Sequence, residues 1–489
     1  MDTFNKKSLC VALAATGVLG AAGVAQAVNV SADGLGNVLI YPYYTVNKDV
    51  NGNSFNTLMS VVNTTASTKA VKVRFREGKN SEEVLDFNVF LSPFDVWTAS
   101  ITPTSAGGGK IATSDTSCTI PTFPTGGVDF RTLQLETTDN AVTRTSEGYF
   151  EVFEMATYTD TSVIGINSKH SAGVPKDCSK VTDAVAITEQ QAPNGGLFGG
   201  VQILSPAGGG MFSQSATALA NFRSAAIYKD TGSPDPTYGN ADPVSNVIVG
   251  KNLYQTTWGA TPVGGAGFNA VTATLMANAV TNEYVLDIGS KSQTTWIVTQ
   301  PTKFNYVKIP STTAVIAPYT SRYVTKVGAC ENFYGIVFNR EEGSPQVITG
   351  TDFSPQPTPG AGPQLCWEAQ SVGFGQSPST TGTASSNVFG SANHNSISTP
   401  YANGWSTLGF NGVLNPSEHS LAATAAATTV VDLTGLSAPL TSQNATYFGL
   451  PVVGFAAITY QNDAISISGK TYLSTFGGDF AHHATKKIQ

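Results

Sequence analysis

The chain has 489 residues, a formal net charge of −7 and only 12% charged side chains, about half the usual share in globular proteins. This negative balance argues against a nucleic-acid-binding protein, because phosphate recognition needs clustered Lys and Arg. Ser, Thr, Asn, Gln and Gly fill the polar positions instead, which favours contacts with neighbouring proteins, sugars or a cell wall.

Residues 1–27 are typical of a secretory signal peptide. Two lysines precede an apolar run at 9–24, and the small residues Ala25 and Ala27 form the site that a signal peptidase needs. The run is too short and glycine-rich for a membrane anchor. We expect export, with cleavage near Ala27, and a secreted product at the cell surface or outside the cell. No later stretch has some 18 uninterrupted apolar residues, so no transmembrane helix is predicted in the mature chain.

The first predicted domain covers residues 28–104 and opens with a strand-like stretch, DGLGNVLIYPYYTV, at 33–46. Residues 70–78 alternate between two faces, one for the core and one for solvent. These faces carry Val71, Val73 and Phe75 on one side and Lys72, Arg74 and Arg76 on the other. Short polar turns between strands and a buried Trp97 predict an immunoglobulin-like β-sandwich.

A Gly/Ser/Pro-rich connection is predicted at 105–146, followed by a second β-rich domain at 147–345. In that domain we expect a short helix at 213–222, SQSATALANF. A β-rich region follows at 346–489 and carries a Ser/Thr/Asn/Gly-rich insertion at 373–406. The predicted fold class is therefore mostly β: the N-terminal sandwich, then a further β-sandwich-type region with short helices and long polar loops.

Four cysteines follow the predicted cleavage site, and an even number in an exported protein favours two disulfides. Three pairings are possible, of which we expect the local one, Cys118–Cys178 and Cys330–Cys366. Each closed loop should stabilise the fold by roughly 3–4 kcal/mol on the chain-entropy model. The spacing of these cysteines lacks the CxxC or Cys/His pattern of a metal site.

A weak calcium candidate lies at Asp49, Asn51 and Asn53, where oxygen ligands alternate around a glycine. Ser60 stands at the position where a twelve-residue calcium loop closes with Glu, and Asn51 with the following glycine is also the commonest hairpin dipeptide. A calcium loop and a plain turn therefore both remain open. No other cofactor is predicted. A second acidic loop carries Asp230, Asp235 and Asp242.

The sequence carries no serine-nucleophile elbow, phosphate-binding loop or zinc-protease motif. Its adjacent acid pairs would point to opposite faces of a strand, so they cannot act together on one glycosidic bond. We therefore predict that the protein is not an enzyme. Trp258, Tyr401 and Trp405 lie in Gly/Asn/Thr-rich stretches and are candidates for stacking on sugar rings, whereas Trp97, Trp296 and Trp367 are predicted core residues.

Several strings in patches from Gly34 to about Ala457 resemble a group of exported proteobacterial cell-surface proteins of unknown function. The strings are GLGNVLIYPYYTV, SVVNTT, EVLDFNVFLSPFDVW, GYFEVFEM, TTWIVTQPTK, LCWEAQSV and GLPVVGFAA. The resemblance implies export, a Gram-negative origin and association with the cell surface. It carries no catalytic residue over to this chain.

These observations favour an exported structural or adhesive β-protein that self-associates, such as a surface-layer or fibre subunit. Its expected partners are further copies of itself or cell-envelope polysaccharide. The alternative is a monomeric secreted protein whose binding depends on carbohydrate or calcium. A secreted hydrolase with scattered catalytic residues is a third hypothesis.

Overall fold

The computed structural model describes residues 27–259, 265–308, 314–343, 346–348, 363–376, 385–411, 418–423, 427–435, 440–442, 444–461, 465–468, 470–472 and 475–489. The predicted signal peptide lies outside the described residues, apart from Ala27. The described part of the chain is mostly β and contains several sheets and a few short helices, which confirms the predicted fold class.

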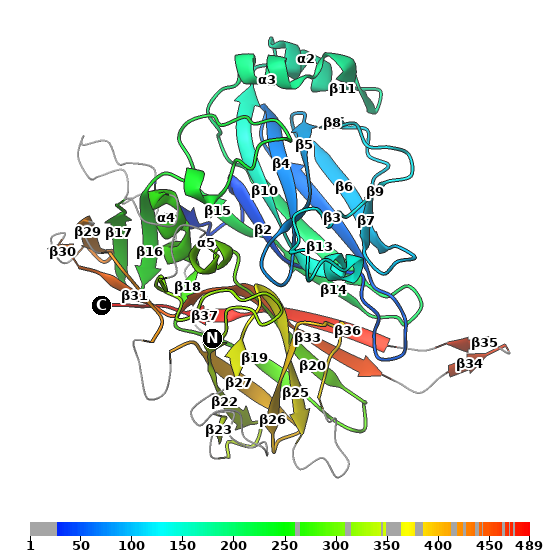
Figure 1. Cartoon of the computed structure of the whole chain (residues 1–489), viewed down its shortest axis with the longest axis vertical. Coiled ribbons are helices and arrows are strands. Elements are labelled where there is room, and N and C mark those ends of the chain that lie inside the picture. Colours follow the sequence, from blue (N-terminus) through cyan, green and yellow to red (C-terminus); the bar gives the residue numbers. More distant parts are fainter. Residues whose placement is uncertain are drawn as a thin grey trace, which may run out of the picture.

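The first half of the chain forms a β-sandwich of two antiparallel sheets, drawn in blue to green in Figure 1. The seven-stranded sheet has the order β1 (Asn29–Val30), β15 (Thr217–Ala220), β2 (Val38–Thr45), β10 (Glu147–Tyr158), β4 (Thr68–Glu77), β5 (Glu83–Leu91) and β8 (Cys118–Ile120). The six-stranded sheet has the order β14 (Met211–Ser215), β13 (Leu197–Leu204), β3 (Asn56–Asn63), β6 (Val96–Pro103), β7 (Gly109–Ala112) and β9 (Val128–Asp129).

The core of this sandwich lies between the two sheets. Val71, Val73 and Phe75 of β4 enter it, as their alternation predicts, and so does Trp97 of β6, whose ring centroid lies 5.4 Å from that of Phe87. These side chains are fully or almost fully buried. Large aromatic side chains contribute much of the apolar area that such a core removes from water.

The strand pairing runs across the predicted domain boundaries. β10 lies between β2 and β4 in the seven-stranded sheet, and β13 pairs with β3 in the six-stranded sheet. The predicted 28–104 unit therefore closes only with strands from beyond residue 146, and the predicted connection at 105–146 itself supplies β7, β8 and β9. The sequence does not reveal these pairings, because β-strands that pair with each other can be far apart along the chain.

The short helix predicted at 213–222 is wrong. This segment forms the end of β14 and the whole of β15, which pair with β13 and β2 respectively. Ala216, Leu219 and Ala220 would share one face of a helix, but Leu219 is instead buried in a strand of the sheet, between β1 and β2. Tertiary pairing overrides the strong helical propensity of alanine here.

A small helical insertion interrupts the sandwich between β10 and β13 and covers one end of it (Figure 1). It contains α2 (Val163–Ser168), β11 (His170–Ser171), β12 (Val174–Pro175), η3 (Cys178–Lys180) and α3 (Asp183–Glu189). Side chains of Ser162 and Thr182 accept hydrogen bonds from backbone N–H groups in the first turns of α2 and α3. These N-caps explain where both helices begin.

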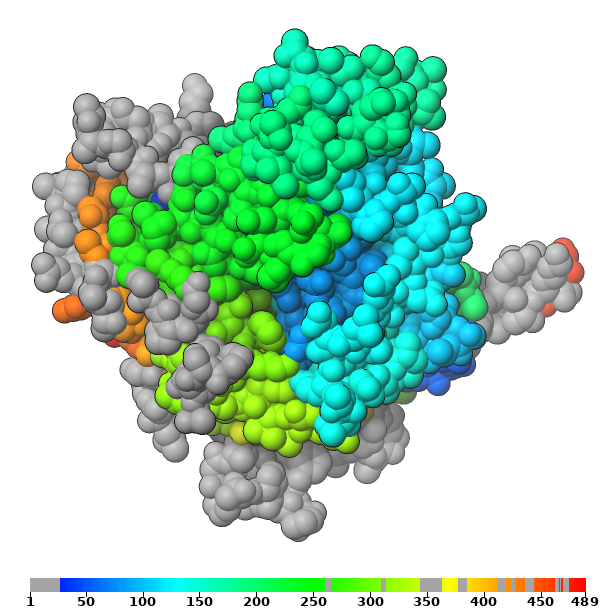
Figure 2. Space-filling model, turned by 45° about the horizontal axis from the view of Figure 1, so that its top comes forward, coloured from blue at the N-terminus to red at the C-terminus, as the bar shows by residue number. Residues whose placement is uncertain are grey.

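The basic face of β4 is predicted to point to solvent, but another segment of the chain covers it. Residues 221–243 cross the outer side of the seven-stranded sheet, and Figure 2 shows this green segment against the blue strands. Lys72 Nζ donates to the backbone oxygens of Asp230 and Ser233 at 2.8 and 2.9 Å. Arg74 donates to the carbonyls of Pro234 and Pro236 at 2.7 and 2.8 Å. The covering segment thus buries the outer face of β4, and the core of the sandwich buries the other face.

The second half of the chain builds another sandwich, in the lower part of Figure 1. One five-stranded sheet has the order β23 (Gln346–Ile348), β22 (Tyr334–Asn339), β27 (Asn403–Gly409), β19 (Ala279–Val285) and β37 (His483–Thr485). The other has the order β26 (His394–Thr399), β25 (Ala369–Gln376), β20 (Gln293–Thr299), β33 (Val453–Gln461) and β36 (Thr475–Ala481). Trp296 of β20 is buried in its core, as predicted.

Smaller elements flank the second sandwich. A four-stranded sheet has the order β16 (Val244–Val249), β17 (Asn252–Thr257), β29 (Ala427–Asp432) and β30 (Leu440–Ser442), with α4 (Ala266–Leu275) and α5 (Phe304–Val307) nearby. Short pairs and ribbons are formed by β18 (Met276–Ala277) with β32 (Leu450–Pro451), β21 (Glu331–Asn332) with β24 (Gln364–Leu365), β28 (Ser420–Ala422) with β31 (Thr446–Phe448) and β38 (Lys487–Ile488), and β34 (Ile465–Ile467) with β35 (Lys470–Tyr472).

The predicted polar insertion at 373–406 contains the second half of β25, all of β26 and the start of β27. β26 runs parallel to β25, and Phe374 and Ile397 of this region are buried. The five-stranded sheets also combine strands from both sides of residue 345, so the predicted division there does not separate two independent sheets. Serine- and threonine-rich strands resemble loops in composition, which explains the difference.

An aromatic cluster joins the two sandwiches. Phe389 packs between Tyr43, Phe212 and Phe455, with ring centroids 4.9 to 6.1 Å apart. None of the helices among the described residues is long and apolar enough to cross a membrane.

Candidate functional site

The outer face of the six-stranded sheet carries an open trough across β14, β13, β3 and β6. Its volume is about 580 Å³. The register of the strands sets side chains in rows across the sheet: Ser213, Gln202, Leu58 and Ser100 form one row, and Ser215, Gly200, Ser60 and Thr98 form the next. Because successive residues alternate between faces, all of these point away from the core.

The hollow follows from the small residues of the second row. Gly200 has no side chain, and its strand neighbours on either side are Ser60 and Ser215. Larger side chains flank this row along the strands: Phe198, two residues before Gly200 on β13, is 42% exposed, and Leu58, two residues before Ser60 on β3, is 37% exposed. The trough therefore has a shallow polar floor beside apolar ledges.

No charged residue lines the trough among the described side chains. Its polar groups are hydroxyls and amides, which donate and accept hydrogen bonds without a net charge. Such a surface can bind a neutral ligand with many hydroxyl groups. Two carboxylates outside the lining, Asp479 and Asp115, accept hydrogen bonds from the backbone N–H groups of Ser213 and Thr98 at 2.8 and 3.2 Å.

A larger cleft of about 850 Å³ lies beside β5, with residues 121–134 forming its opposite wall. Four of the charged groups in its lining pair with partners within the protein. Glu83 pairs with Arg74 at 2.8 Å, Asp86 with Lys72 at 3.2 Å and Asp129 with Lys110 at 3.8 Å. Burial raises the pKa of the Asp86 carboxyl. We give this cleft less weight than the trough as a binding site because a ligand there would compete with internal ion pairs.

The calcium candidate forms a compact turn. Asp49 Oδ1 accepts hydrogen bonds from the backbone N–H groups of Asn51 and Asn53 at 2.9 and 2.8 Å, and Oδ2 accepts one from Asn53 Nδ2 at 3.1 Å. The carboxylate is thus engaged by its own loop, as in an Asx turn. The three predicted ligands do lie close together, and calcium binding by them stays a prediction.

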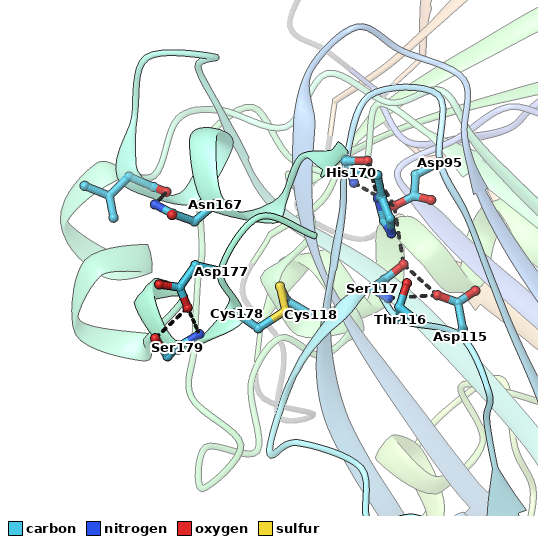
Figure 3. Close-up of a disulfide and its surroundings, with 12 residues drawn as sticks. Asp95, Asp115, Thr116, Ser117, Cys118, Asn167, His170, Asp177, Cys178 and Ser179 are labelled. Carbon is cyan, nitrogen blue, oxygen red and sulfur yellow. Dashed lines mark hydrogen bonds and ion pairs between the residues drawn. A yellow bond between two sulfur atoms is a disulfide. The ribbon is translucent and has the colours of Figure 1, made fainter. Parts of the chain in front are cut away.

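Both predicted cysteine pairs lie at disulfide distance. Cys118 and Cys178 have their sulfur atoms 1.97 Å apart, and Cys330 and Cys366 have theirs 2.02 Å apart. The first bond ties η3 of the helical insertion to β8, as Figure 3 shows. Two disulfides fit an oxidising, extracellular environment.

Beside this disulfide, His170 meets Asp95 and Ser92 (Asp95 and His170 are labelled in Figure 3). Its Nδ1 atom lies 3.0 Å from Ser92 Oγ and 3.5 Å from an Asp95 carboxylate oxygen. In a hydrolytic triad the serine and the acid contact opposite nitrogens of the histidine ring. This group shares one nitrogen and therefore lacks the geometry of such a triad. Burial raises the pKa of the Asp95 carboxyl.

The predicted sugar-stacking residues have different environments. Trp258 is buried and its Nε1 donates to Ser245 Oγ at 2.9 Å, so its prediction as an exposed platform is wrong. Trp405 is 41% exposed and stacks on Phe338, with ring centroids 3.9 Å apart. Tyr401 is partly buried and packs on the core of the second sandwich. The structure does not bring the three rings into one site with the trough.

Sequence reasoning missed the trough. Its central strand, LFGGVQIL, shows the alternation of a half-exposed strand, with Phe198, Gly200 and Gln202 on one face. That pattern alone could have indicated an exposed strand face that carries a phenyl ring, then a glycine without a side chain, then a carboxamide. It could not show that Ser60, Thr98 and Ser215 lie beside it, because those residues come from three other strands.

Comparison with known proteins adds no relative to this description: no model of a protein family matches the chain, and no curated protein matches it.

Proposed function

We propose that this chain is an exported, non-enzymatic adhesive protein that binds a neutral polysaccharide of a cell envelope in the trough. The observation that carries the proposal is the uncharged lining of hydroxyl and amide groups across four strands. Four strands span about 14 Å at the usual strand spacing. An open trough of this width suits a segment of a polymer.

The apolar ledges support the same ligand class. One face of a sugar ring presents C–H groups, and an exposed aromatic ring such as Phe198 can pack against it. Sugar hydroxyls can then exchange hydrogen bonds with Gln202 and with the serines of the floor. The predicted signal peptide and the two disulfides fit an exported protein, and the low overall charge fits a surface that faces polysaccharide.

The test is retention of the mature chain, residues 28–489, on neutral and acidic polysaccharides in affinity electrophoresis. We expect retention by at least one neutral polymer. Ser213→Glu places a charge at the edge of the trough and should weaken retention at least tenfold, and Gln202→Ala should weaken it less. Ser398→Glu is the matched control, because Ser398 is also exposed on a strand but lies on β26. Retention by no neutral polymer, or equal retention of all variants, would refute the proposal.

A second candidate function is self-association through β36, the last strand in its sheet. Phe476 and Phe480 are 58% and 49% exposed on this strand. Exposed apolar side chains on one strand face can pack against another chain. Sedimentation velocity of the mature chain should then show a large species that Phe476→Lys disperses. A monomer at high protein concentration would reject this candidate and leave the trough proposal unaffected.

A further inference from the structure

A lysine, a glutamate and an asparagine meet in a buried cluster of the first sandwich, away from the trough. Lys69 lies on β4 and Glu154 on β10, and neither side chain is exposed. Lys69 Nζ lies 2.5 Å from Glu154 Oε1 and also contacts the side-chain oxygen of Asn194. Asn194 lies in the loop that leads into β13. One amine thus contacts a carboxylate and a carboxamide at the same time.

The surroundings give Lys69 the character of a nucleophile. Burial lowers the pKa of its ammonium group, which favours the neutral amine. Glu154 is the base in contact with that nitrogen. A buried lysine next to a base is a recognised way to activate an amine.

The same glutamate positions the electrophile. The backbone N–H groups of Asn194 and Gly195 donate to Glu154 at 3.1 and 2.9 Å, and Asn37 Nδ2 donates to it at 2.8 Å. Asn194 Nδ2 in turn donates to Ser67 Oγ at 3.1 Å. These contacts fix the carboxamide against Lys69, and its carbonyl carbon is bonded to the oxygen that the amine contacts. Holding two groups in this way replaces a bimolecular encounter by an intramolecular one.

From this geometry we propose that Lys69 and Asn194 become joined by an intramolecular isopeptide bond. Glu154 takes a proton from the Lys69 ammonium, and the neutral Nζ attacks Asn194 Cγ. The Nζ–Cγ bond forms, Glu154 passes its proton to Nδ2, and the Cγ–Nδ2 bond breaks so that Nδ2 leaves as ammonia. Nζ, which still carries two hydrogens, gives one of them back to Glu154 and becomes the amide nitrogen. An amine and a primary amide thus give a secondary amide and ammonia, with no oxidant or cofactor. Asn194 is itself exposed, so ammonia has a path to solvent.

The bond would link the two sheets of the sandwich. Lys69 belongs to the seven-stranded sheet, whereas Asn194 lies three residues before the start of β13 in the six-stranded sheet. It would also hold the end of the helical insertion, whose other attachment is the disulfide between Cys118 and Cys178. The inference is independent of the proposed polysaccharide binding.

The test is mass spectrometry of the purified mature chain after reduction of its disulfides. We expect the intact mass to fall short of the sequence mass by one ammonia molecule. Trypsin does not cleave after an acylated lysine, so digestion should give residues 49–72 joined to residues 181–223. Neither peptide contains cysteine. Recovery of a free peptide 49–69 together with the full intact mass would show an ordinary ion pair and overturn the proposal.

A different loss of ammonia must be separated from this one. Asn194 precedes Gly195, and attack by the Gly195 nitrogen would form a succinimide with the same mass change. That product leaves Lys69 free for trypsin, so ammonia loss without a joined peptide would also overturn the proposal. Lys69→Arg and Glu154→Gln should both abolish the joined peptide. Lys72→Arg, which changes another buried lysine on β4, should retain it.

Discussion

The two sandwiches bury polar groups on their strands in different ways. In the N-terminal sandwich, Arg144 pairs with Glu77 at 2.8 Å and with Glu136 at 2.5 Å, and further pairs such as Arg76 with Glu151 are almost as well buried. In the C-terminal sandwich and its flanking sheets, neutral hydroxyl groups occupy many comparable positions. Thr256 Oγ1, for example, lies 2.9 Å from Thr428 Oγ1 and 2.7 Å from the Tyr447 hydroxyl.

This difference teaches that one architecture can satisfy buried polar atoms either with charges or with hydroxyls. A buried charge loses much more hydration than a hydroxyl, so it depends strongly on its partner. A hydroxyl can donate and accept, and it loses less when one partner is removed. The N-terminal sandwich should therefore be the more sensitive half to loss of a single polar side chain.

The largest expected effect is at Arg144. Arg144→Met removes the partner of two carboxylates and leaves Glu77, whose side chain is fully buried, without its cation. Breaking a buried pair on one side costs several kcal/mol, and we expect a loss of about 5 kcal/mol here. Urea denaturation measures it. Arg340→Met is the control, since that pair with Glu341 is exposed and should change stability by less than about 0.5 kcal/mol. A loss below about 1 kcal/mol at Arg144 would contradict the comparison.

The second-largest expected effect is the loss of a disulfide, of which each half of the chain has one. Replacing Cys118 and Cys178 with serine opens a loop with a sequence separation of 60 and should cost about 4 kcal/mol on the chain-entropy model. The Cys330 and Cys366 pair, with a separation of 36, should cost slightly less. Denaturation of each double variant, with the oxidised parent as reference, tests this order. A much larger loss at the second pair would reverse it.

The third effect separates the halves by pH. Burial lowers the pKa of His482 in the C-terminal sandwich to about 4, so the unfolded chain binds a proton that the folded chain does not. Stability from this group is complete above pH 6.5 and is lost as the pH falls to about 4, by up to about 3 kcal/mol. His482→Gln should make the free energy of unfolding depend less on pH between pH 7 and pH 4, as measured by denaturation at a series of pH values. An unchanged slope would contradict the assignment.

The N-terminal sandwich should respond at lower pH through Glu136. Although burial opposes its ionisation, the hydrogen bond and charge of Arg144 bring the pKa of Glu136 down to about 2. Its contribution to stability is present above the ordinary glutamate pKa of 4.5 and is lost as the pH falls towards 2. Glu136→Gln should therefore alter the pH dependence below 4.5 and leave the window of His482 unchanged.

The smallest effect is at a hydroxyl. Tyr447→Phe removes one hydrogen bond to Thr256, which keeps its contact with Thr428. We expect a loss of about 1 kcal/mol, the usual net contribution of one hydrogen bond. Thr434→Ala, at an exposed turn, serves as the control. If Tyr447→Phe destabilised the protein as much as Arg144→Met, charges and hydroxyls would not differ in the proposed way.

Alternation along the chain was enough to predict the fold class and several strands. Val71, Val73 and Phe75 show which face of β4 enters the core, because that information is local. The polar face of the same strand could not be read in this way. Lys72 and Arg74 look solvent-exposed in sequence, and only a segment some 160 residues later buries them. Domain boundaries were misplaced for the same reason, since β10 and β13 return to the first sandwich.

The candidate sites divide similarly. The disulfide pairing followed from short separations along the chain, and the turn at Asp49 from adjacent residues. The trough depends on register among four strands, and the contact of Lys69 with Asn194 spans more than a hundred residues. A single sequence carries no direct signal for such juxtapositions. They emerge only when the strands are placed in order.

The central place of β10 has a consequence for how the protein is made. Every residue of this twelve-residue strand is buried, and both of its neighbours in the sheet, β2 and β4, precede it by many residues. A chain synthesised only as far as residue 140 therefore exposes the edges of β2 and β4 that β10 later covers. Such edges invite pairing with other chains, and long-range strand pairing is slow. The nascent protein is therefore open to mispairing with other chains until β10 has been synthesised.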